Sequence, residues 1–178
     1  MSEFSESYHL RSERAEDACE VLRQLGLAGF VFPPTRGWVT FVVEGDEFVA
    51  DQRLVAAVRR PLLHFVSAEE HGWGFTFFEN AQVVCAYRAS WDDEVQFDDS
   101  RYARATLDRL LPEAKAAALD ALEQEMRATD YEELFDSGLS AEFAQAIGLE
   151  HYDWLAYRYL EKDWQRWPDR FRGVIQIK

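Results

Sequence analysis

Cysteine is scarce in this chain. Cys19 and Cys85 are the only two among 178 residues, and they lie far apart among apolar neighbours. A disulfide framework or a cysteine-based metal site needs more cysteines, or cysteines closer together. We therefore predict two buried free thiols in a reducing compartment, which favours the cytoplasm.

Long apolar runs are lacking as well. No stretch approaches the roughly 20 consecutive apolar residues that a membrane-spanning helix requires. Residues 1–6 are acidic and polar, whereas a signal peptide has a basic start followed by an apolar segment. The sequence thus predicts a soluble protein with no membrane association.

The motifs of common catalytic and cofactor sites are missing. The chain contains no phosphate-binding P-loop, no G-x-S-x-G nucleophile turn, no H-E-x-x-H zinc motif and no C-x-x-C pair. We predict no cofactor, and the favoured hypothesis is that the protein is not an enzyme.

Positive charge is low and unevenly distributed. Lysine and arginine number 19 against 33 acidic residues, which gives a net charge of −14. Residues 113–153 are strongly acidic, whereas bases outnumber acids in residues 154–178. Phosphate backbones repel such a chain, so the composition disfavours general nucleic-acid binding.

The chain is rich in β-branched and aromatic residues between Leu62 and Ala89. Three strands are predicted there, Leu62–Ser67, Trp73–Phe78 and Gln82–Arg88. The last two form a hairpin that turns at residues 79–81.

The residues before this region alternate between strand and helix patterns. The predicted strands are Ser7–Arg11, Phe30–Phe32 and Trp38–Val43. The predicted helices are Ala15–Leu25 and Asp51–Arg60. Ser12 is the predicted N-cap of the first helix, and Gly26 its end. The resulting order β-α-β-β-α-β predicts an α+β fold, with an antiparallel sheet in a split βαβ (ferredoxin-like) arrangement extended by the hairpin.

The rest of the chain has mainly helical patterns. Helices are predicted over residues 101–111, 114–126, 131–136, 141–147 with Ser140 as the cap, and 154–167, followed by a final strand over 173–177. We predict one compact domain, with a sheet part at 1–98 and a mainly helical part at 99–178. Because the strands are apolar on both faces, a second cover must come from the hairpin, the helical part or a second copy of the chain.

Two histidines could form a catalytic site. If the first and fourth strands pair, alternation predicts that His9 and His64 both face away from the two helices. They could then share a metal ion or a proton, with Asp92 from the acidic loop 92–99 or His151 as a further ligand. This is the alternative hypothesis: a small metal-assisted hydrolase using His9, His64 and Asp92.

The C-terminal segment interleaves bases with aromatic residues. The members of this basic aromatic stripe are Trp154, Tyr157, Arg158, Lys162, Trp164, Arg166, Trp167 and Arg170. If helical, the stripe could bind an acidic partner or nucleic acid. Alternatively, its aromatic residues dock on the sheet and its bases pair with the acidic helices from Glu113 onward.

Residues 143–157 resemble a short segment found in uncharacterised bacterial proteins, a likeness that implies no activity. The acidic, aromatic-rich α+β style is also similar to that of bacterial immunity proteins, which neutralise a toxin partner. The favoured hypothesis is therefore a bacterial-type protein that acts through protein–protein contacts, immunity- or inhibitor-like, with an unknown protein partner or as a homodimer.

Overall fold

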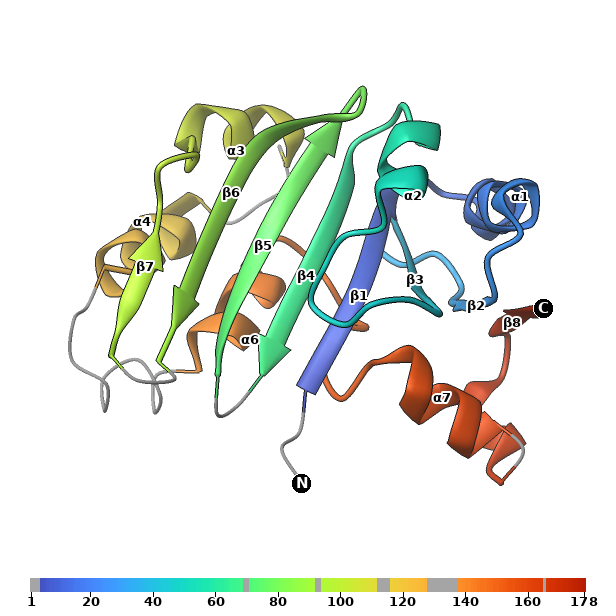
Figure 1. Ribbon diagram of the computed structural model, residues 1–178. Helices are drawn as coiled ribbons and strands as arrows, with labels where there is room; N and C mark the ends of the chain where they lie inside the picture. Colours follow the sequence, from blue (N-terminus) through green and yellow to red (C-terminus); the bar gives the residue numbers. More distant parts are fainter. Residues whose placement is uncertain (1–3, 69–70, 92–93, 112–115, 128–137, 165) are drawn as a thin grey trace.

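A computed structural model describes residues 4–68, 71–91, 94–111, 116–127, 138–164 and 166–178, with the backbone alone at Pro168 and Arg170. Within these residues the chain forms one antiparallel sheet of eight strands in the order β7-β6-β5-β4-β1-β3-β2-β8 (Figure 1). The predicted α+β class is confirmed, and so is the place of the hairpin beside β4.

The strands are β1 (Phe4–Arg11), β2 (Gly29–Val31), β3 (Trp38–Val43), β4 (Leu62–Ala68), β5 (Gly72–Glu79), β6 (Gln82–Ser90), β7 (Gln96–Asp98) and β8 (Ile175–Ile177). The described helices are α1 (Ala15–Leu25), α2 (Gln52–Ala57), α3 (Arg104–Leu110), α4 (Ala116–Glu125), α6 (Leu139–Ala146), α7 (Tyr157–Trp164) and the 3-10 helix η1 (Pro168–Phe171). None of them is long and apolar enough to cross a membrane.

Local sequence signals account for two of the sharpest features. The hairpin between β5 and β6 turns at Asn80 and Ala81, which both have positive φ, 50° and 63°. Two consecutive left-handed residues match the right-handed twist of paired strands. Helix α1 ends at Gly26, whose φ of 64° suits a residue without a side chain.

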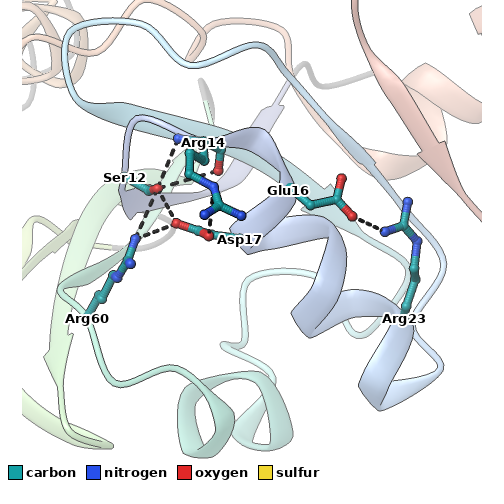
Figure 2. Close-up of polar contacts among 6 residues, drawn as sticks. All are labelled: Ser12, Arg14, Glu16, Asp17, Arg23 and Arg60. Carbon is teal, nitrogen blue, oxygen red and sulfur yellow. Dashed lines mark hydrogen bonds and ion pairs between the residues drawn. The ribbon is translucent and has the colours of Figure 1, made fainter.

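Helix α1 begins with a polar cluster in place of a simple cap (Figure 2). Its N-cap position is Arg14, which makes no side-chain capping bond, so the prediction of Ser12 as the N-cap is wrong. The Ser12 hydroxyl accepts a hydrogen bond from the Arg14 N–H at 3.1 Å and donates one to Asp17. Arg60, just before β4, pairs with the same Asp17 carboxylate. The cluster therefore ties the end of β1 to the chain that enters β4.

The sheet is covered on two faces. On the first face, α1 and α2 pack Leu22 and Leu54 against Phe41. On the second face, α3, α4 and α6 pack on β4, β5 and β6, where the rings of Phe143 and Phe75 stack at 4.2 Å. Helix α7 covers the β2 end of the second face. The helical part of the chain thus supplies the second cover.

Several expectations about the C-terminal half need correction or fall outside the description. Ser140 is not the cap of α6, which begins at Leu139 after Gly138. Trp154 lies before the helix, because α7 begins only at Tyr157. The final strand is confirmed as β8, which pairs with β2. The predicted helix at 131–136 lies outside the described residues.

The two cysteines are free and buried, as predicted. Burial raises the pKa of both thiols, so neither has the depressed pKa of a reactive cysteine.

Candidate functional site

The loop between β3 and α2, residues 44–51, crosses the first face in front of β1 and β4 (Figure 1). Two side chains of β1 fasten it. The Asp51 N–H donates to the Tyr8 hydroxyl at 2.8 Å, and the Phe48 N–H donates to Oε2 of Glu6 at 3.0 Å. Burial raises the pKa of Tyr8, so its hydroxyl keeps its proton at neutral pH.

Phe48 has an unusual conformation. Its φ is +66°, and its side chain is 42% exposed. A bulky side chain in the left-handed region costs roughly 1–2 kcal/mol, and such strain is concentrated at functional sites. The next residue, Val49, is 61% exposed, so the loop presents two apolar side chains to solvent.

Contacts at the start of β1 join this loop to α7. The ring of Phe48 packs edge-on against Phe4 at 5.0 Å, and the Arg158 guanidinium lies 4.2 Å from the centre of the Phe4 ring. Arg158 also pairs with Glu47 at 3.2 Å, and Tyr159 lies 5.3 Å from Phe4. We call these five residues the aromatic junction.

A concavity lies on each side of the loop. One, of about 520 Å³, is lined by acidic side chains together with Arg53 and Arg158. The other, of about 540 Å³, lies over β4, β5 and β6 on the first face, with Phe48 and Val49 as one wall. We call the second concavity the sheet groove. Val49 belongs to the lining of both.

His64 lies under this loop. Its Nε2 is 2.9 Å from Oε1 of Glu6, and its ring stacks on Tyr8 at 4.7 Å. Glu6 therefore binds both the imidazole and the backbone of Phe48, one with each carboxylate oxygen. The imidazole is buried but lines the sheet groove.

His9 lies on the other face, so the prediction that the two imidazoles share a face is wrong. The register pairs His64 with Tyr8, and His9 with Leu63 and Thr40. Neighbouring residues of a strand point to opposite faces, so His9 and His64 point away from each other.

His9 has a structural role, because both of its ring nitrogens are hydrogen-bonded within the protein. Its Nε2 and Nδ1 make hydrogen bonds with Ser7 and Thr40, at 2.9 and 3.0 Å. Complete burial lowers the pKa of His9 to about 3. Asp92 lies outside the described residues, and within them no group of three His, Cys, Asp or Glu side chains could hold a metal ion.

The basic aromatic stripe is divided by the fold. Tyr157 and Trp164 are partly buried and pack on Phe30 of β2, against the core. Trp154 and Trp167 are 55% and 48% exposed.

The bases of the stripe have separate surroundings. Arg158 pairs with Glu47 rather than with an acidic helix. Arg166 lies over the Trp167 ring, Lys162 is exposed, and the Arg170 side chain is not described. Two acids of α4, Asp120 and Glu123, pair with Arg104. Among the described residues, no ion pair joins a base of the stripe to an acid of residues 113–153.

Trp154 resembles Phe48 in its backbone. Its φ is +53°, and the residue after it is bonded to β1: Leu155 N–H donates to Ser5 Oγ at 3.1 Å, and Glu6 N–H donates to the Leu155 carbonyl at 2.7 Å. Both strained aromatic residues therefore lie at the same end of β1.

Sequence comparison assigns no relatives to this chain. No family model matches it, and neither a curated protein nor a solved structure matches it.

Proposed function

We propose that this protein acts through protein–protein contacts made by the aromatic junction together with Val49 and Trp154. The observation that supports this most directly is the conformation of Phe48 and Trp154, which are both exposed and both in the left-handed region. Aromatic side chains held rigidly at the surface are typical anchors of protein interfaces.

The charge of the chain indicates the kind of partner. With a net charge of −14 and an acidic concavity beside the junction, a basic protein would be attracted over long range. An acidic protein that blocks a basic toxin would have these features, so we retain the immunity- or inhibitor-like role and a bacterial, cytoplasmic setting. The neighbour order β4-β1-β3-β2 supports the split βαβ arrangement as the scaffold.

Affinity capture from a lysate of the source organism tests this function. The bait is the full chain, the test variant is Phe48→Ser with Trp154→Ser, and the matched control is Phe97→Ser with Trp167→Ser. The control removes two exposed aromatic residues from β7 and from the turn before η1. Circular dichroism should first show that all three are folded.

We expect a stoichiometric partner that the test variant loses and the control retains. Loss with the control alone would refute the proposed surface and place it at Phe97 or at Trp167 of the basic aromatic stripe, which the two single variants would distinguish. If no bait captures a partner and light scattering shows only monomers, the proposal is refuted. A dimer that only the test variant loses would identify a second copy as the partner.

A further inference from the structure

The sheet groove has a floor without large side chains. On the first face of β4, β5 and β6 it is lined by Val66, Ala68, Gly72 and Gly74. A Cβ atom on Gly74 would lie 2.8 Å from the Tyr87 carbonyl oxygen, so close pairing of the strands keeps this position as glycine. These four residues give the floor an apolar area without bulky side chains beside Thr76, on which the face of an aromatic ring can lie.

A ring nitrogen of His64 opens into this groove. Among the side-chain nitrogen and oxygen atoms of the described residues that are sealed from solvent, only Nε1 of Trp73 lacks a hydrogen-bond partner. Nδ1 of His64 has no partner among the described residues, so it is not sealed, and His64 lines the groove. In the tautomer that donates Nε2–H to Glu6, Nδ1 carries the lone pair that can accept a hydrogen bond from a ligand.

A cationic side chain stands on the other side of the floor. Arg88 of β6 is exposed, lines the groove and pairs in register with Gly74. No ion pair joins it to another described residue, whereas most of the described arginines have acidic or aromatic partners. The net charge of −14 opposes the approach of an anion, and Arg88 supplies the local positive charge that would offset this repulsion for one carboxylate.

We propose that the sheet groove binds a small aromatic acid with a hydroxyl group para to its carboxylate arm. The ring lies on the floor beside Phe48, the hydroxyl donates to Nδ1 of His64, and the carboxylate accepts from Arg88. His64 and Arg88 lie on strands two spacings apart, about 10 Å, and are offset by two residues along the sheet, about 7 Å. Their Cα atoms are therefore about 12 Å apart, which leaves room between the two side chains for a phenylacetate with a hydroxyl and a carboxylate at opposite ends. The volume of about 540 Å³ lies in the range of small-molecule sites.

The groove shares Phe48 and Val49 with the surface proposed for the protein partner. Its test uses the free protein and pure compounds, so this proposal and the proposed function can fail separately. Calorimetric titration of the full chain at neutral pH would compare 4-hydroxyphenylacetate, phenylacetate and 4-methylphenol. We expect saturable binding of the first. Phenylacetate should bind about three- to tenfold more weakly, because it lacks the donor for one neutral hydrogen bond.

Two variants test the other end of the ligand. Arg88→Gln should weaken 4-hydroxyphenylacetate about two- to fivefold, the range of an exposed ion pair, and should leave 4-methylphenol unchanged. Arg101→Gln removes another exposed arginine with no ion pair to a described residue, and it should change neither affinity.

Nuclear magnetic resonance of the imidazole nitrogens avoids mutating the buried His64. The Nδ1 signal should shift with 4-hydroxyphenylacetate and stay in place with phenylacetate. The proposal would be overturned if the three compounds bound with equal affinity, or if none of them saturated the protein. It would also be overturned if the Nδ1 signal moved equally with 4-hydroxyphenylacetate and phenylacetate.

Discussion

Acid should weaken this fold through His9. The imidazole is completely buried, and its pKa is lowered to about 3 from the ordinary 6.5. Between these two values the unfolded chain binds a proton that the folded chain does not, so stability must rise with pH in this window. Each pH unit is worth about 1.4 kcal/mol. At pH 5 this one residue should therefore cost the fold about 2 kcal/mol relative to its stability above pH 7.

The variant His9→Asn isolates this contribution. It should lower stability at neutral pH by roughly 1–3 kcal/mol, because the bonds with Ser7 and Thr40 are disturbed. It should also lose the His9 part of the pH dependence, so the two stability curves converge as the pH falls from 6.5 to 4. Leu63→Val, at the residue paired with His9, is the matched control, since it destabilises the same core without removing a titrating group.

Urea unfolding followed by tryptophan fluorescence at a series of pH values measures both curves. If the His9→Asn curve runs parallel to that of the wild type from pH 7 to pH 4, burial of a neutral imidazole does not explain the acid sensitivity. The curve of Leu63→Val should run parallel to the wild-type curve.

Three further predictions concern backbone strain and surface charge. Trp154→Asn should raise the unfolding temperature, with a gain of about 0.5–1 kcal/mol, because asparagine tolerates positive φ; an unchanged or lower temperature would contradict strain at this residue. Gly26→Ala should lower the free energy of unfolding by about 1 kcal/mol, because its φ of 64° strains a residue with a side chain. Gly29→Ala should lower the unfolding temperature clearly more in the same thermal melts, because its Cβ would lie 2.5 Å from the Val42 carbonyl oxygen. Equal losses for the two variants would refute the close approach at Gly29. Hydrogen bonding to Ser12 and pairing with Arg60 lower the pKa of Asp17, so Asp17→Asn should destabilise the protein at pH 7. In urea titrations, the difference in stability between wild type and variant should vanish as the pH falls through that lowered pKa.

The elements that the sequence predicts well have a local cause. Strand alternation fixes β3 and β5, and the conformational freedom of Gly26 fixes the end of α1. Local signals fail where a tertiary contact competes with them. Trp154 has a helical neighbourhood, yet the bonds of Leu155 with β1 keep the chain out of the helix until Tyr157.

The candidate site was less predictable for a similar reason. The face of a strand residue depends on the register, and a shift of one residue exchanges the faces; this is why His9 and His64 were expected together. Phe48 follows Gly45 and acidic residues in an ordinary polar turn, and nothing in that pattern indicates a left-handed phenylalanine. Its conformation depends on Glu6, which is distant in sequence.

The pairing of β2 with β8 bears on the order in which the protein folds. Gly29 lies opposite Ile177, so these strands close a loop that includes almost every other element, and the entropic cost of closing loops slows folding. The pairs β5–β6 and β2–β3 join strands that are near in sequence and can form early. The β8 edge should therefore assemble late and open first, and its amides should exchange hydrogen faster than those of β1, which has a neighbour on each side.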